Sequence, residues 1–503
     1  MAGRSFGEER AERRGIRLGG RSLRQHTARG AILNAVFLSS LAGIGLGRRF
    51  LVAIFLTAAD YGLWGLIYVA VVTVIWLKDV GISDKFIQQE DADQEAAFKQ
   101  AFTLNLLWTG LFSVLIVALL PLFALIYGHP EIILPGSVMA VGVLLTAFTA
   151  PTWVLHRQMR FLRERTLLAI EPVLGFVVTI ALAAAGVGYW ALVIGFVSGT
   201  AASGLASVLA SPYRLGLRFD RSALRDYFSF SWPLLVAGGS GLVAVQTATI
   251  LGEATAGLAG LGAIGLVGSI VAFADRVDQI LTQTLYPAVC AVRDRLDLLY
   301  ESFSKSNRLA LLWCMPFGFG LALFAQDIVD YVLGDKWQIA VGLLQVFGVV
   351  AAFKQVAFNW TAYHRALERT RPMAVSGTLS LITFLAVGVP GMIGFGLTGF
   401  AAAAIASEAV ALATRTYFLN RLFEGFNVFR HCARAVAPAL PPLAAVLALR
   451  ALDLGERTGL AVSAELALYV GLNVATVWLM ERSLVREMVG YLRGGAPRPT
   501  PAA

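Results

Sequence analysis

The sequence predicts an all-α polytopic membrane protein with about fourteen transmembrane helices, arranged as two six-helix lobes plus two extra C-terminal helices. Composition is the first reason: 57% of the 503 residues are hydrophobic and 15% are charged, whereas a soluble protein is about 45–50% apolar and about 25% charged. The second reason is a series of apolar runs of roughly 18–25 residues, each long enough to cross a hydrocarbon core as a helix. The third is the alternation of arginine-rich and arginine-poor connections between those runs.

The apolar runs begin near residue 30 and end near residue 480. The predicted spans are residues 30–56, 61–78, 101–126, 132–155, 167–186, 189–211, 228–252, 258–288, 309–325, 339–361, 373–392, 396–419, 435–451 and 459–480. A basic stretch after the sixth span resembles the segment before the first, which predicts two halves with the same orientation. The predicted parts are a basic tail (1–29), a first lobe with spans 1–6 (30–211), a bridge (212–227), a second lobe with spans 7–12 (228–420), spans 13 and 14 (421–480) and a C-terminal tail (481–503).

The connections predict the orientation of the chain. The first 29 residues hold eight arginines, and almost every second connection after them is also basic. The basic connections contain Arg157, Arg160, Arg163 and Arg165; Arg214, Arg218, Arg221 and Arg225; Arg293, Arg295, Lys305 and Arg308; Arg365, Arg369 and Arg371; and Arg421, Arg430 and Arg434. The connections between them, such as residues 186–189, are short and poor in Lys and Arg. Because basic loops stay in the cytoplasm, both termini are expected there.

Several ionisable residues lie at membrane depth in the predicted topology. They are Arg48, Arg49, Glu171, Glu253, Asp275, Arg276, Asp278, Lys354, Glu408 and Arg415. Each costs about 2.5–3.5 kcal/mol at the centre of a membrane helix, so such residues usually line a polar pathway or pair with one another. Glu408 and Arg415 are seven residues apart, which places them two turns apart on one helix face.

The stretch "VAFADRVDQILTQTLYP" at residues 271–287 carries the densest group of these charges. Helical spacing places Asp275, Asp278, Gln279, Thr282 and Tyr286 on one face, where they form a polar stripe. Two carboxylates three residues apart repel each other, and a carboxyl group that changes its protonation state can couple a proton or sodium gradient to movement. The alternative is that Asp275 and Asp278 pair with Arg276 and with arginines of neighbouring helices.

Motifs for chemistry are mostly absent from the sequence. No GxxxxGK[ST], HExxH, CxxC or GxSxG occurs, and the acidic pair Asp91 and Asp93 lies in a solvated loop. We therefore expect that the protein is not an enzyme and that it has no cofactor and no metal site. The net charge of +9 does not indicate nucleic-acid binding, because the arginines are distributed as determinants of membrane topology.

Five stretches resemble a known family, the polysaccharide transporter family of the multidrug/oligosaccharidyl-lipid/polysaccharide (MOP) exporter superfamily. They are "FLTAADYGLWGLIYV" (55–69), "GVGYWALVIGFVSG" (186–199), "RLGLRFDRSALRDYFSFSWPLL" (214–235), "LYPAVCAVRDR" (285–295) and "VLGDKWQIAVGLLQVFGVV" (332–350). The likeness covers roughly residues 25–420, in the order expected for this family.

The resemblance implies flipping or export of polyprenyl-diphosphate-linked oligosaccharides across the bacterial inner membrane. Two lobes would rock around a central basic cavity, and glycosyltransferases or a polymerase of the same pathway would be partners. We expect Arg48, Arg49, Arg276, Lys354 and Arg415 to bind the substrate in this cavity, because arginine donates paired hydrogen bonds to phosphate. Asp275, Asp278, Glu171 and Glu408 are the candidates for ion coupling.

Two other functions stay open at this point. An integral-membrane glycosyltransferase or polymerase would normally carry a large outer loop with acidic catalytic residues, but the longest predicted outer loop, residues 326–338, is short. A multidrug exporter of the same superfamily would share the topology, and transport of fluorescent cations would distinguish it.

The orientation can be tested with single cysteines in the predicted connections. Cysteines that replace Gly188 or Gly394 should react with an impermeant reagent added outside the cell, because both positions lie in arginine-poor connections. Cysteines that replace Arg163 or Arg369 should be protected. The reverse labelling pattern would contradict a cytoplasmic location of both termini.

Overall fold

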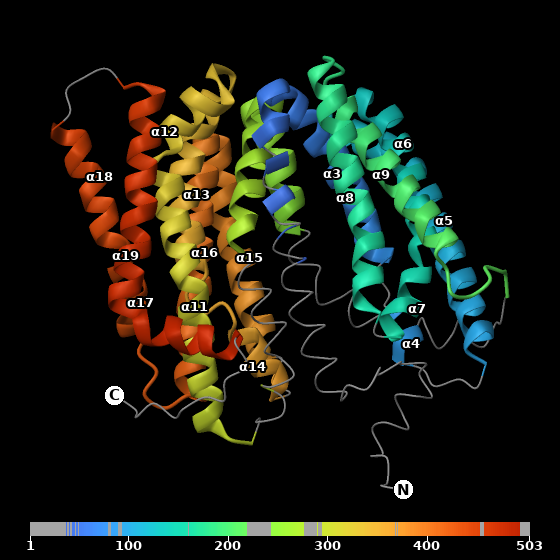
Figure 1. Cartoon of the computed structure of the whole chain (residues 1–503). Helices are drawn as coiled ribbons and strands as arrows, with labels where there is room; N and C mark the ends of the chain where they lie inside the picture. Colours follow the sequence, from blue (N-terminus) through green and yellow to red (C-terminus); the bar gives the residue numbers. More distant parts are fainter. Residues whose placement is uncertain are drawn as a thin grey trace, which may run out of the picture. The chain divides into compact units, whose positions relative to one another are not determined.

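The computed structural model describes residues 37, 40, 43–45, 47–48, 50–78, 82–88, 93–158, 160–218, 243–275, 289, 294–367, 369, 371–452 and 457–492. All regular elements in these residues are helices, which confirms the predicted all-α class (Figure 1). Within this part of the chain, 11 helices are long and apolar enough to cross a membrane, or up to 12 if one bent pair forms a single span. The predicted count of about fourteen is therefore not confirmed.

The helix around Gly257 differs from its prediction. The sequence predicts two spans, 228–252 and 258–288, but the structure has a helix over Val243–Asp275. Gly257 lies where the interruption was expected and takes a left-handed φ of 65°. Glycine adopts this conformation without a side-chain clash, so the helical segment continues through Gly257 despite its irregular backbone.

The chain divides into two compact units, Met1–Leu266 and Val267–Ala503. The first unit contains α3 (Ala58–Lys78), α4 (Ile82–Gln88), α5 (Gln94–Tyr127), η1 (Pro130–Ile132), α6 (Ile133–Leu145), η2 (Thr146–Thr149), α7 (Pro151–Arg157), α8 (Phe161–Ala184) and α9 (Trp190–Leu209). The lobe boundaries expected from the sequence remain a prediction.

Local signals explain where the longest helix of the first unit begins and ends. Asp93 is the N-cap of α5, and its side chain accepts a hydrogen bond from the backbone N–H of Ala96 at 3.0 Å. The helix ends at Gly128, which has a left-handed φ of 74°. An acidic N-cap and a left-handed glycine after the last turn are the usual ends of an α-helix.

The second unit contains α11 (Leu296–Leu323), α12 (Ala325–Ile328), η3 (Val329–Leu333), η4 (Asp335–Ala340), α13 (Val341–Lys354), α14 (Trp360–Ala366), α15 (Arg371–Phe395), α16 (Leu397–Leu422), α17 (Val428–Val436), η5 (Ala437–Ala439), α18 (Leu440–Leu452) and α19 (Gly459–Leu492). Helix α13 packs against α11 and α16, and α16 packs against α15 (Figure 1). The site described below lies on α13 and α16.

Ion pairs attach α18 and α19 to the rest of the second unit. Arg450 of α18 bonds to Asp327 at 2.9 Å and to Glu465 of α19 at 2.9 Å. Further along α19, Glu481 pairs with Arg308 of α11. Charged contacts therefore hold α19 near its N-terminus and at Glu481, and the two C-terminal spans belong to this unit.

Glycines allow α11 and α13 to approach closely. A Cβ atom at Gly318 would lie 2.4 Å from the carbonyl oxygen of Gly348, and one at Gly348 would lie 2.6 Å from that of Gly318. Small residues at such a crossing permit the close backbone packing that stabilises helix pairs in membranes.

Two glycines of α13 provide a matched test of this contact. Gly348→Ala should destabilise the protein by about 1–3 kcal/mol, because the added methyl group meets backbone atoms that cannot move aside. Gly342→Ala should be neutral or stabilising, because no described atom lies within 4 Å of its Cβ position and alanine favours a helix by about 1 kcal/mol. Thermal unfolding of both variants in detergent would show the difference, and equal melting temperatures would contradict the packing argument.

Candidate functional site

The backbone is irregular between α13 and α14. Residues 355–359 connect the two helices, and Ala357 within them has a φ of 60°. A left-handed φ is uncommon for a residue other than glycine. Gln355, Ala357 and Asn359 are almost completely buried, which fits the rule that non-helical backbone at membrane depth must be enclosed by protein.

Side chains of α11 supply the hydrogen bonds that the interrupted helix lacks. Asn307 Nδ2 donates to the carbonyl oxygen of Gln355 at 2.9 Å, and Asn307 Oδ1 accepts from the N–H of Ala357 at 2.9 Å. Asn359 Nδ2 donates to Ser306 Oγ at 2.8 Å. The interruption is therefore fixed by tertiary contacts and has a defined shape.

Four charged residues meet where α13 ends, and we call them the charge cluster: Asp275, Lys354, Glu408 and Arg415. Lys354 Nζ lies 2.8 Å from Asp275 Oδ2, and Arg415 Nη2 pairs with Glu408 Oε1. Arg415 Nη1 also donates to the carbonyl oxygen of Lys354 at 2.7 Å, which joins the two pairs. Two cations and two carboxylates give the cluster no net formal charge.

The two cations of the cluster differ in accessibility. The Arg415 side chain is 4% exposed, and its Nε, Nη1 and Nη2 atoms each have a partner in the protein. The Lys354 side chain is 33% exposed. The geometry therefore gives Arg415 a structural position, whereas Lys354 is the more exposed cation of this cluster.

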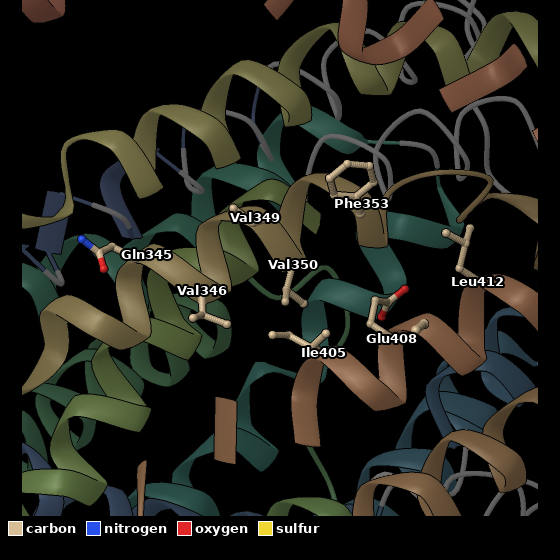
Figure 2. Close-up of a pocket in the computed structure, with 9 residues that line it drawn as sticks. Gln345, Val346, Val349, Val350, Phe353, Ile405, Glu408 and Leu412 are labelled. Atoms are coloured by element: carbon tan, nitrogen blue, oxygen red, sulfur yellow. The ribbon is translucent and has the colours of Figure 1, made fainter. Parts of the chain in front are cut away.

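An apolar groove adjoins the charge cluster (Figure 2). Its volume is about 530 Å³, within the range of roughly 300–1,000 Å³ typical of small-molecule sites. The residues that line it are Gln345, Val346, Val349, Val350 and Phe353 of α13 and Ile405, Glu408, Ala409 and Leu412 of α16. Glu408 is the charged member of this set, so it belongs to both the groove and the cluster.

The first unit holds another pair of the predicted site residues. Arg48 Nη2 lies 3.4 Å from Thr179 Oγ1 of α8, and Glu171 of the same helix is its electrostatic neighbour. Arg49, Arg276 and Asp278 lie outside the described residues, so their roles stay predictions. Of the polar stripe expected over residues 275–286, the structure describes Asp275, which pairs with Lys354.

Some polar residues of these sites were not among the predicted substrate-binding and coupling residues, which are all charged. Asn307, Gln355 and Asn359 are neutral, although an amide side chain within an apolar run is itself a usable signal. His129 was also missed. Its Nδ1 lies 2.8 Å from Glu131 and its Nε2 lies 3.1 Å from Glu253.

His129 lies in the short connection after α5, outside the candidate spans. Burial lowers the pKa of His129, but the hydrogen bonds and negative charges of Glu131 and Glu253 outweigh burial and raise it above the ordinary value. A raised pKa keeps the imidazole protonated further toward neutral pH. The charged form therefore links the connection to the Val243–Asp275 helix.

Comparisons with known proteins agree with this architecture. A family model described as "Polysaccharide biosynthesis protein" matches residues 51–342. The lipopolysaccharide biosynthesis protein WzxC of Escherichia coli (strain K12) is 23% identical over 351 residues, which cover 67% of this chain and 69% of that protein. The teichuronic acid biosynthesis protein TuaB of Bacillus subtilis (strain 168) is 23% identical over 55% of this chain and 58% of its own length.

A third relative is an uncharacterized membrane protein in the cps region of Klebsiella pneumoniae, 23% identical over 46% of this chain. The match spans half the length of that protein.

Solved structures show the same fold. The lipid II flippase MurJ in an inward closed conformation superposes with a TM-score of 0.68 at 11% identity, covering 90% of this chain and 100% of that one. An inward-facing multidrug resistance MATE family transporter of the MOP superfamily has a TM-score of 0.63 at 12% identity, covering 76% of this chain and 94% of that one. The fold is therefore the one found in transporters and flippases of this superfamily. Since the family model covers more than half of the sequence, the chain belongs to the family of polysaccharide biosynthesis proteins.

Proposed function

We propose that this protein is a flippase that moves polyprenyl-diphosphate-linked oligosaccharide across the bacterial inner membrane for polysaccharide biosynthesis, and that it is not an enzyme. The charge cluster beside the interrupted helix carries the proposal, because it places a partly exposed cation inside a membrane-spanning unit. The family, the polysaccharide biosynthesis relatives and the fold shared with a lipid II flippase support it. Alternating access of two lobes is the proposed mechanism.

The chemistry of the substrate explains the need for such a cation. A diphosphate cannot enter hydrocarbon without a counter-charge, because a buried charge without a partner is strongly unfavourable. In many transporters the substrate site lies at an interrupted helix. Lys354 lies at such an interruption. Arg48, Arg49 and Arg276 are further candidates for substrate binding, whereas Arg415 acts on the site through the carbonyl of Lys354 and through Glu408.

The orientation and surroundings are also part of the proposal. The chain is a multi-pass membrane protein, as its helices and its relatives indicate. We place both termini in the cytoplasm on the basis of the basic connections. Glycosyltransferases or a polymerase of the same pathway would supply or use the substrate.

A multidrug exporter is the second candidate, because the fold is also that of a MATE family transporter. A lipophilic cation would require an available carboxylate in the apolar groove. Glu408 lies there, but its carboxylate is paired with Arg415. The groove therefore favours an apolar group without a positive charge.

The role of Lys354 can be tested in proteoliposomes with a fluorescent lipid-linked oligosaccharide. Lys354→Ala should slow flipping by about tenfold or more, since a hydrogen bond to a charged group contributes about 1.5–3 kcal/mol. Lys99→Ala is the matched control, because Lys99 is similarly exposed (30%) and pairs with Glu95, which is not a member of the cluster. Its flipping rate should equal that of the wild type.

A double variant separates substrate binding from structural loss. Lys354→Ala leaves Asp275 without its cation, whereas Lys354→Ala combined with Asp275→Asn removes both charges of the pair. If Lys354 binds the diphosphate, the double variant should unfold at the wild-type temperature but still flip slowly. Recovery of flipping in the double variant would contradict a role in substrate binding.

We further propose that Asp275 and Glu408 couple flipping to a proton or sodium gradient, with Glu171 and Asp278 as additional candidates. A cation bound at Asp275 would weaken its pair with Lys354 and free the ammonium for phosphate. Asp275→Asn and Glu408→Gln should therefore leave slow transport that no longer responds to an imposed gradient in vesicles. Glu465→Gln is the control, because Glu465 is a buried carboxylate paired with Arg450 outside the cluster. A normal gradient response in both cluster variants would exclude coupling through these residues.

A further inference from the structure

We propose that the groove between α13 and α16 holds the isoprenoid chain of the substrate while its diphosphate lies at Lys354. This inference rests on the proposed flippase function and adds the place where the hydrocarbon part binds. It follows from the shape, chemistry and depth of the groove.

The groove is formed by one face of each helix. On α13 the lining residues follow helical spacing from Gln345 to Phe353, and on α16 they follow it from Ile405 to Leu412. Gln345 and Phe353 are eight residues apart, so the α13 wall is about 12 Å long. Gln345 lies at one end, and Phe353, Glu408 and Leu412 lie at the other (Figure 2). The second end contains Glu408, a member of the charge cluster, and Phe353, the residue before Lys354 in the sequence.

The walls of the groove are held in place by packing on other faces. Phe347 of α13 stacks on Phe400 of α16 with ring centroids 5.3 Å apart. The opposite side of α13 is fixed by the contact between Gly348 and Gly318. Inside the groove, Val349 and Ile405 are 40% and 50% exposed in the described structure. The groove is therefore preformed and open.

The chemistry of the walls selects hydrocarbon. The central lining residues are Val346, Val349, Val350 and Ile405, whose side chains offer no hydrogen-bonding group. A sugar placed there would leave its hydroxyl groups without partners, at a cost of about 1–3 kcal/mol each. A branched hydrocarbon chain has no hydrogen-bonding groups and therefore pays no such cost.

The depth of the cluster distinguishes the substrate from ordinary lipid. Glu408 lies near the middle of α16, Leu397–Leu422, so the helix continues about 16 Å on one side and about 21 Å on the other. The headgroup of a resident phospholipid stays at the bilayer surface, about 15 Å from the centre. An anionic headgroup that reaches Lys354 while its chain fills the groove therefore belongs to a lipid whose headgroup is crossing the membrane.

Photo-crosslinking of the full-length protein in nanodiscs tests this placement. Benzoylphenylalanine at Val349 should crosslink a labelled polyprenyl diphosphate at least about fivefold more than the same group at Ile382, a 55% exposed position of α15 outside the groove. Unlabelled polyprenyl diphosphate should compete, and phosphatidylglycerol should not. Equal crosslinking at the two positions, or competition by phosphatidylglycerol, would show that the groove holds bulk lipid and would overturn the inference.

A substitution that fills the groove with a larger side chain provides a second test of the inference. Ala409→Trp should weaken binding of the labelled polyprenyl diphosphate by about tenfold, whereas Ile382→Trp should leave binding unchanged. Wild-type binding by Ala409→Trp would contradict the inference. Flipping of the complete lipid-linked oligosaccharide is measured separately. If the wild type flips the substrate but Val349 does not crosslink, the groove is not the binding site and the proposed function stands. If Val349 crosslinks but the wild type does not flip the substrate, the proposed function is wrong.

Discussion

The hydrogen bonds from Asn307 to the interruption after α13 determine where the charged residues of the second unit meet. In a continuous helix, the carbonyl oxygen of Lys354 would accept a hydrogen bond from the N–H four residues later. The helix instead stops at Lys354, because Asn307 binds the backbone of Gln355 and Ala357. The freed carbonyl of Lys354 accepts from Arg415, which in turn holds Glu408. One amide side chain thus supports a chain of contacts that ends at the groove.

The sequence was sufficient for the all-α class and for several of the charged residues. Membrane-depth charges are expensive, so Asp275, Lys354, Glu408 and Arg415 could be selected from composition and position alone. The spacing of seven residues also placed Glu408 and Arg415 on one face, and the structure shows them paired. The spacing could not predict that Asp275 pairs with Lys354, because the two residues are 79 positions apart in the sequence.

The interruption itself could not be predicted from local sequence. Residues 352–362 read "AFKQVAFNWTA", which contains neither glycine nor proline, so the run from 339 to 361 reads as one uninterrupted span. The helix is stopped by Asn307, a residue of another helix, and tertiary contacts of this kind override local propensity. The opposite error occurred near Gly257. There, the sequence predicts a break between residues 252 and 258, but Glu253 pairs with His129 and the helical segment continues.

The neutrality of the charge cluster fits a carrier that must return empty. If Lys354 binds a diphosphate in the loaded state, the same ammonium needs a counter-charge after release, because an unpaired lysine within the bilayer costs about 2.5–3.5 kcal/mol. Asp275 lies 2.8 Å from it and provides that charge. Arg415 cannot exchange partners as easily, since it is buried and holds the backbone of Lys354 as well as Glu408. On the proposed mechanism, Arg415 therefore keeps the site in shape, and the pair of Lys354 and Asp275 opens and closes with each substrate.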